Sequence, residues 1–590
     1  MTNAELVSRW SDRLAAAKKW RESVMVRERW ESYLREFDGN FNDVIGMGKD
    51  VPPINDVYAY TQSAQSAFYN RDPYITVNPT RKSSIMGAVI LEAAVNYYWR
   101  KLDIKSAVQS EIQDCILIGH AWNKTGYNVE LSGDGSQLQV KSDTLFSNRV
   151  SWRDIYFNIG SMNPPYDSSW VMHRIYLPLD TVKKRYGSKA KDLHGSSLPD
   201  FTKEMKESVI YKDDIQFVSL YEIWDASERM IYLYCDENQT FMDNARPWPE
   251  YMRSYPFQML AFNRINDKPY PKSDIAPWEP QLLEKIKLQW LMLNHMKRWS
   301  RTMVGKKGAL SPSEQTKFAQ GIDGTYLESS ASDIQTAFRT LDYGSLPPDI
   351  YAVLDRIEGV IRSVSGQPEF DRGGSTQART RTLGELELIQ SGSQTRTDRK
   401  TDLIETHCEE IARHMIAHMQ AQFYVPQIVK ITGREPQEVI AAFGNKFDPL
   451  SQTIEFSKED IMGEYDINVK SGSTLPLNKK TRDQMLQKVL ELAAPFAQAA
   501  SIPPFIAVTM KEILKGYDIQ SLEAAFDAQM QEMQQQQQAQ AQDGNVQVDK
   551  TKAETRKRDA QSAQIEQNVQ VKELELMGKA GGHVPMETSL

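Results

Sequence analysis

The sequence predicts an α+β protein that is mainly helical. Long stretches without proline or glycine occur near the start and in the middle of the chain, as helices require. Residues 50–270 instead contain short runs rich in β-branched and aromatic residues, without the regular alternation of a βαβ fold. The 12 Trp, 25 Tyr and 20 Phe provide apolar surface for a large core, which excludes disorder throughout the chain.

Composition narrows the class of protein further. At about 150 residues per domain, 590 residues predict about four compact units or one elongated, multi-lobed subunit. Three widely spaced cysteines favour a reducing compartment and small core positions over a disulfide scaffold. No apolar run reaches the roughly 18 residues needed to cross a bilayer, so we expect a soluble chain without membrane contact. The net charge of −8 argues against a general nucleic-acid binder.

The first half of the chain reads as helices followed by a strand-rich lobe. The segment Ser132-Gly133-Asp134-Gly135 supplies the positive φ of a hairpin turn. Helices are predicted at residues 5–37, 55–70, 84–117 and 181–186. Strands are predicted at residues 71–79, 121–131, 138–140, 155–159, 171–177, 218–224 and 230–235.

A long helix is predicted from about residue 277, because Pro277 and Pro280 suit a first helical turn and no breaker follows before Gly305. At 100° per residue, one face carries Leu282, Ile286, Leu293 and Met296. Other sides of the helix also carry apolar residues, at Leu288, Leu291 and Trp299. Such wide apolar sectors favour a central core helix. The alternative is a helix packed between neighbouring copies in an oligomer.

After this helix, the chain is predicted to leave the main body, form a small insert and return to the body. A Gly/Ser-rich insert, residues 305–344, has a short helix near 313–320 and a strand near 325–328, and a second helix at 349–365 returns. A mobile loop is predicted at residues 366–381. Beyond it we expect helices at 382–424, 481–494 and 505–515, strands at 454–456 and 465–469, and a Gln-rich tail from 529 that is disordered or zipped against other copies.

Catalytic motifs are not apparent in the sequence. His407, Glu410, His414 and His418 share one helical face, but the outer two are about 16 Å apart along the axis, so one ion cannot bind all four. At most His414 and His418 could chelate together. A polar helix face, with Glu410 paired to His414, is the favoured interpretation. The sequence therefore predicts no enzyme, no cofactor and no metal site.

A few cations are the most plausible phosphate contacts. Three lie in the predicted loop and two at the start of the insert: Arg372, Arg379, Arg381, Lys306 and Lys307. Glycines beside arginines in a mobile loop suit transient contact with a nucleic-acid backbone rather than base readout. Ordinary surface charge is the equally weighted alternative.

Several passages together resemble the portal proteins of tailed bacteriophages, most closely those of short-tailed phages. The resemblance lies in their order over nearly the whole chain up to about residue 520. The passages are residues 55–79 (NDVYAYTQSAQSAFYNRDPYITVNP), 152–158 (WRDIYFN), the helix–insert–helix at 277–365, the loop at 366–381, and 465–482 (YDINVKSGSTLPLNKKTR).

The resemblance implies a ring, usually a homododecamer, at the unique capsid vertex of a virion that is assembled in the host cytoplasm. Double-stranded DNA would pass through its channel during packaging and ejection. Large terminase, capsid and scaffolding proteins and tail adaptor proteins would be its partners. The implied parts are an N-terminal helical segment (1–45), wing (46–272), first stem helix (273–304), clip (305–346), second stem helix (347–365), tunnel loop (366–381), long helix with returning wing strands (382–480), crown helices (481–528) and tail (529–590).

On this interpretation the acidic charge has a purpose, because a conduit should hold DNA loosely while a few cations steady it. Two other classes remain open. One is a DNA-processing enzyme subunit, which would need a carboxylate or nucleotide constellation that the sequence does not display. The other is a virion structural or adaptor protein without a pore.

Overall fold

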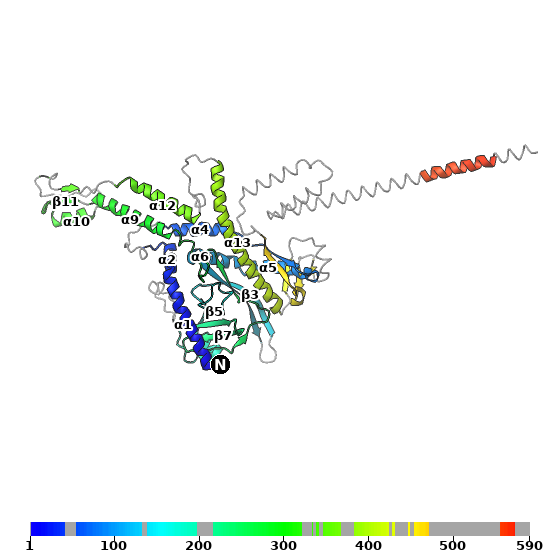
Figure 1. Cartoon of the computed structure of the whole chain (residues 1–590), viewed down its shortest axis with the longest axis horizontal. Coiled ribbons are helices and arrows are strands. Elements are labelled where there is room, and N and C mark those ends of the chain that lie inside the picture. Colours follow the sequence, from blue (N-terminus) through cyan, green and yellow to red (C-terminus); the bar gives the residue numbers. More distant parts are fainter. Residues whose placement is uncertain are drawn as a thin grey trace, which may run out of the picture. The chain divides into compact units, whose positions relative to one another are not determined.

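The computed structural model contains both helices and strands, and about half of its residues are helical, which confirms the α+β class (Figure 1). It describes residues 2–41, 55–132, 139–196, 216–301, 303–320, 333, 338–340, 346–366, 383–423, 427–430, 447–448, 453–470 and 555–572. The chain divides into two units, Met1–Pro476 and Leu477–Leu590. In the described parts, no helix is both long and apolar enough to cross a membrane.

The predicted N-terminal helix is present but interrupted. Helix α1 (Asn3–Arg27) begins at Thr2, whose side chain and that of Glu5 form a capping box. Arg29 then takes a left-handed conformation, so α2 (Trp30–Phe37) starts in a new direction. The buried side of α1 contributes Trp10 and Leu14 to a core shared with the largest sheet.

The largest sheet is antiparallel and has the spatial order β4-β5-β6-β7-β8, with β9 also paired to β7. Helix α7 (Leu179–Tyr186) packs beside β5 and β6 and closes a small third core. The six strands of this sheet are β4 (Ile155–Phe157), β5 (Trp170–Pro178), β6 (Phe217–Asp225), β7 (Met230–Cys235), β8 (Thr240–Phe241) and β9 (Arg246–Pro247).

A second antiparallel sheet has the order β10-β2-β3. Its strands are β2 (His120–Ser132), β3 (Gln139–Val150) and β10 (Phe257–Ala261). The hairpin expected from the Gly-rich turn is confirmed by the pairing of β2 with β3, whereas β10 was not predicted. Smaller sheets join β13 (Gln427–Lys430), β15 (Thr453–Phe456) and β14 (Phe447–Asp448), and β1 (Ile75–Pro79) with β16 (Tyr465–Val469).

A group of helices packs against the β10-β2-β3 sheet and against the smaller sheets. Residues 84–117, predicted as one helix, are two, because Asp103 has a positive φ of 49° between α5 and α6. Gly119 ends α6 with φ 103°. The helices of this layer are α4 (Asp56–Phe68), η1 (Lys82–Ser84), α5 (Ile85–Lys101), α6 (Ile104–Ile118) and α13 (Leu383–Gln422). Together with β2 and β10 they enclose the main hydrophobic core.

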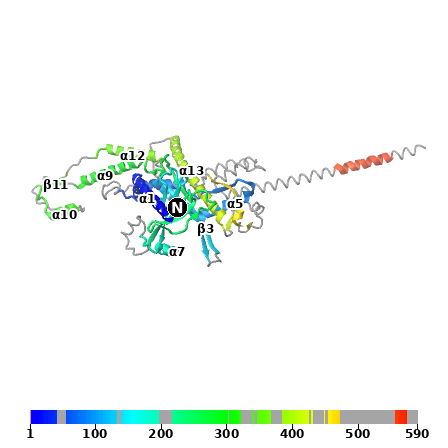
Figure 2. The same cartoon turned by 60° about the horizontal axis from the view of Figure 1, so that its bottom comes forward.

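Helices α9 (Glu279–Arg301) and α12 (Asp349–Ser365) pack against each other and run side by side in both views (Figures 1 and 2). Between them, β11 (Met303–Gly305) pairs antiparallel with β12 (Phe338–Thr340), and α10 (Pro312–Gln320) lies in the insert. The chain thus leaves along α9 and returns along α12. We call α9, β11, α10, β12 and α12 the arm.

Several predicted features fall outside the described residues. These are the strand at 325–328, the loop at 366–381 apart from Gly366, the helices at 481–494 and 505–515, and the Gln-rich run. In the second unit, residues 555–572 are helical and every one is exposed. The three cysteines are buried and unpaired, as predicted for core positions.

Gly119 fixes the junction between α6 and the segment that leads into the arm. A Cβ atom there would lie 2.6 Å from the carbonyl oxygen of Pro271 and 2.8 Å from the carbonyl carbon of Lys272. Gly119→Ala should therefore destabilise the protein by about 2–4 kcal/mol, through a left-handed backbone and a clash with main chain. Midpoints of guanidinium unfolding, followed by tryptophan fluorescence, measure the change.

The matched control is Gly359→Ala. Gly359 lies within α12, is exposed, and has open space where a Cβ would be placed. Here alanine should raise stability by about 0.5–1 kcal/mol, because it favours the helix. Equal midpoints for the two variants would contradict the role assigned to Gly119.

Candidate functional site: the arm and its tip

The arm begins in the main core. Trp278, Leu282 and Ile286, which line the start of α9, are almost fully buried. The ring of Trp278 lies 5.4 Å from that of Tyr60 in α4. From the returning helix, Ile357 joins the same core. The base of the arm is therefore fixed to the body by apolar contacts of both helices.

A buried lysine links the two arm helices to the body. Lys285 Nζ lies 3.0 Å from Asp56 Oδ2 in α4 and 3.0 Å from Glu358 Oε1 in α12. Its side chain is 9% exposed, so both pairs are shielded from solvent more than a surface pair would be. Loss of either carboxylate would leave the lysine incompletely compensated.

Next to it lies a cluster of charges that joins α2 to the first turn of α9. Arg29 is 2.6 Å from Glu279 Oε1, and the Tyr33 hydroxyl donates to Glu279 Oε2 at 3.0 Å. Glu36 is completely buried beside this pair. Burial, followed by the negative charge of Glu279, raises the pKa of Glu36 to about 8, and Arg29 opposes the rise. The Glu36 carboxyl is therefore mostly protonated at neutral pH.

The distal half of α9 exposes apolar side chains. Leu293 and Met296 share the face of Leu282 and Ile286, yet they are 37% and 56% exposed. Leu291, on nearly the opposite side, is 55% exposed. The predicted core helix is therefore confirmed only for its first half. Over the second half, the described chain leaves both apolar sectors partly exposed.

Helix α12 repeats this pattern. Ile357 and Ile361 are buried, whereas four apolar side chains of the same helix are 37–56% exposed: Tyr351, Val353, Val360 and Val364. Isolated exposed apolar residues are ordinary on protein surfaces. A set of them along both helices of one arm is instead a surface suited to binding another molecule.

The tip carries two of the predicted cations. Lys306 and Lys307 lie in the turn after β11, where the amide of Ala309 donates to the carbonyl of Lys306 at 3.0 Å. Both side chains are exposed, and neither forms an ion pair with a described carboxylate. They are thus available to an anionic partner. The other three predicted cations, Arg372, Arg379 and Arg381, lie outside the described residues.

The predicted pairing of Glu410 with His414 on a polar face of α13 is wrong, because the four side chains contact different elements. His407 Nε2 lies 2.8 Å from Glu111 Oε2 in the core, and Tyr166 donates to Glu410. His414 and His418 contact Ser254 and Tyr251, respectively. Each side chain finds a partner outside α13, and no group of three or more potential ligands in the described parts is placed to hold a metal.

Sequence reasoning missed the charged anchors of the arm. Glu279 and Lys285 look like solvated positions on a helix, because their partners lie 246 and 229 residues away. The sequence contained only a weak indication of these anchors. Two charges of opposite sign lie six positions apart among apolar residues at the start of the helix. Only the packing of α2 and α4 against α9 shows that both are buried.

No protein-family model matches this chain, and no curated protein matches it. Among the described residues, the arm combines a rigid base, uncovered apolar faces and a cationic tip. Chemically, that combination can bind another macromolecule.

Because the pKa of Glu36 is higher in the folded chain than the ordinary value near 4.5, its proton stabilises the fold at low pH. This contribution is lost as pH rises from about 5 through 8, at up to about 1.4 kcal/mol per pH unit. In the Glu36→Gln variant the side chain at position 36 stays neutral at every pH, so this loss of stability should disappear. Free energies of unfolding, measured for both proteins from pH 5 to pH 8, test the expectation.

Glu22→Gln, which removes an exposed carboxyl from the neighbouring α1, is the control for an altered net charge. The wild type should lose stability relative to Glu36→Gln as pH rises, and not relative to Glu22→Gln. Parallel profiles for wild type and Glu36→Gln would show that Glu36 ionises normally.

Proposed function

We propose that this protein is the subunit of a phage portal: a ring, usually of twelve copies, at the unique capsid vertex. The ring is the channel for genome packaging and ejection and the docking site for large terminase and tail adaptors. The observation that carries the proposal is the arm, whose base is buried in the body while its distal apolar sectors are uncovered in the described chain.

The arrangement of the exposed residues favours a ring over a simple dimer. At 100° per residue, Leu291 and Met296 point to directions about 140° apart on α9. A twofold dimer covers one patch of each subunit, whereas a closed ring gives each subunit two neighbours. In a cyclic arrangement, the arms of the two neighbouring subunits would cover opposite sides of each helix pair.

Charge supports a conduit for DNA. Each copy carries a net charge of −8, so a ring of such subunits repels phosphate and DNA slides without adhering. Lys306 and Lys307 at the tip, with Arg372, Arg379 and Arg381 of the loop, would supply the few transient contacts that steady the duplex. In this assignment the tip also faces terminase and, later, tail adaptors.

Electron microscopy of the purified, full-length protein tests the assembly. Negatively stained particles should be rings with a central channel, and light scattering should give a mass of many subunits. Monomers that persist at high concentration would overturn the proposal and favour a virion adaptor without a pore. Hydrolysis of ATP or DNA by the same preparation would instead favour a DNA-processing enzyme.

The exposed faces of α9 provide a sharper test. Leu291→Glu and Met296→Glu place an unpaired carboxylate in the proposed interfaces, at a cost of about 3 kcal/mol or more for each contact. Either variant should shift the protein from rings to smaller species in light scattering. Its circular dichroism and unfolding midpoint as a monomer should stay unchanged, because neither side chain is buried in the subunit.

Val26→Glu is the matched control, because Val26 is 80% exposed at the end of α1 and is not part of the arm. It should leave the rings intact. Rings formed equally by all three variants would mean that the arm does not lie at the interface between copies.

The loop assignment has its own test. Replacing Arg372, Arg379 and Arg381 with Ala should weaken the capture of duplex DNA by purified rings at low salt and reduce its salt dependence, because fewer counterions are released. Fluorescence anisotropy of a labelled duplex measures both. The rings themselves should persist. Replacing the three exposed cations Lys183, Lys184 and Arg185 of α7 with Ala controls for the loss of positive charge, and equal effects of the two variants would remove the assignment.

A further inference from the structure

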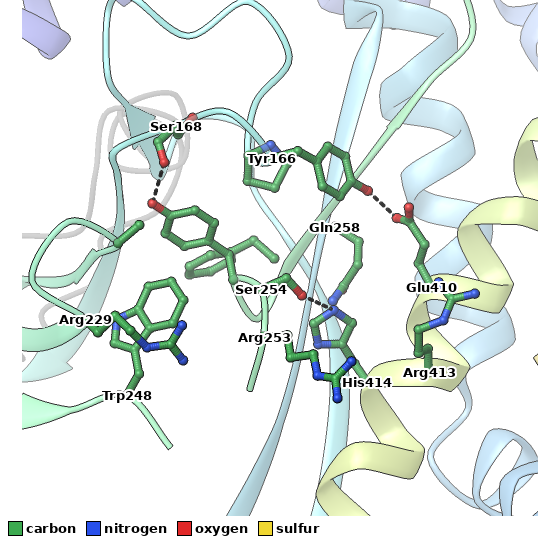
Figure 3. A pocket seen from close by; sticks show the side chains of 14 residues that line it. Tyr166, Ser168, Arg229, Trp248, Arg253, Ser254, Gln258, Glu410, Arg413 and His414 are labelled. Atoms are coloured by element: carbon green, nitrogen blue, oxygen red, sulfur yellow. Dashed lines mark hydrogen bonds between the residues drawn. The ribbon is translucent and has the colours of Figure 1, made fainter. Parts of the chain in front are cut away.

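A cavity of about 250 Å³ lies where the strand-rich lobe meets α13 (Figure 3). Three separate segments of the lobe line it, in the loop before β5, the turn between β6 and β7, and the segment before β10. The fourth wall is one turn of α13 around His414. The proposed ring uses none of these residues.

The cavity concentrates positive charge in an acidic protein. Arg229, Arg253 and Arg413 line it, and Glu410 is the one carboxylate among the lining residues. At neutral pH these four groups sum to about +2, whereas the whole chain carries −8. The Tyr166 hydroxyl already donates to Glu410, so part of that negative charge is satisfied.

Two of the arginines have no partner among the described residues. Arg229 is held in place: it donates to the Met252 carbonyl at 2.8 Å and lies over the Trp248 ring at 5.1 Å. Arg253 and Arg413, by contrast, line the cavity, are exposed, and make no hydrogen bond or ion pair within the described chain. Their guanidinium groups are free to bind an anion and come from two different walls, one from the lobe and one from α13.

His414 supplies a neutral polar group between these walls. Its Nε2 lies 3.2 Å from the Ser254 hydroxyl. Burial, then His418 and then Arg413 lower the pKa of His414 to about 4, so the imidazole is uncharged at neutral pH. The positive charge that attracts an anion into the cavity therefore comes from the arginines. Ser254 and His414 can donate or accept hydrogen bonds.

We propose that this cavity binds a phosphate group, either as inorganic phosphate or as the monoester of a small molecule. The planar guanidinium fork matches two phosphate oxygens at once, and two free forks from different walls suit a compact, multiply charged oxyanion. The volume lies just below the range of about 300–1,000 Å³ typical of larger ligands, which limits the ester group. Trp248 and Tyr255 provide an apolar wall for such a group.

Calorimetric titration of the full-length protein with inorganic phosphate tests the site, with ionic strength held constant by sodium chloride. Saturable binding is expected. The double variant Arg253→Gln/Arg413→Gln should bind about tenfold more weakly or worse, because it loses charge-assisted hydrogen bonds. Arg413→Lys keeps the charge and loses the fork, so it should bind with intermediate affinity.

Arg246→Gln is the matched control, because Arg246 is an exposed arginine in β9 of the largest sheet and does not line the cavity. It should bind as the wild type does. Equal binding by the wild type and the double variant, or no saturable heat from the wild type, would overturn the proposal. Acetate that binds as tightly as phosphate would also overturn it.

Glycerol 3-phosphate distinguishes the two sources of the phosphate group. Tighter binding than inorganic phosphate supports an ester, with its organic part against Trp248 and Tyr255. Weaker binding supports free phosphate. Either result supports a phosphate site, and neither depends on the formation of rings.

Discussion

The burial of α13 is the constraint on which the rest of the first unit depends. Over its second half, this helix contacts α4, α5, β2, β10 and β16, so it must be apolar on several sides. Its fully buried side chains are Ile404, Cys408, Ile411, Ala412, Met415 and Met419. Two polar contacts fix its register, since Lys400 lies 2.6 Å from Asp274 and His407 lies 2.8 Å from Glu111. Asp274 lies five residues before the start of α9, so α13 positions the arm as well as the sheets.

Much of this fold could be predicted from the sequence, because its elements are long and their breakers are unambiguous. The helices α4, α9, α12 and α13 begin and end close to the predicted residues. The break at Asp103 was missed, because nothing in an Asp residue requires a left-handed backbone there. The strands β8 to β14 were also missed, because most are runs of two to four residues that only their partner strands identify. The equally short β4 and β15 were predicted, because both are rich in β-branched and aromatic residues.

The site was less predictable, because burial decides what a charged or apolar residue does. Leu282 and Met296 have the same periodicity on α9, yet one lies in the core and the other is exposed. Lys285 and Glu279 have the composition of a solvated helix, yet both are buried by α2, α4 and α12. The arginines of the cavity come from three distant segments, so no local pattern joins them. Such sites exist only once the fold has formed.

The pairing of β1 with β16 also sets the order of events during synthesis. Thr76 donates to the carbonyl of Asn468, 392 positions later in the chain. At about 5–20 residues per second, the ribosome needs about 20–80 s to make that partner. Until then β1 can rest on α5, whose Asn96 and Glu92 side chains accept from the amides of Ile75 and Val77 at 3.1 Å. The first unit therefore closes late, after the whole arm has left the ribosome, and an incomplete chain would lack this closure.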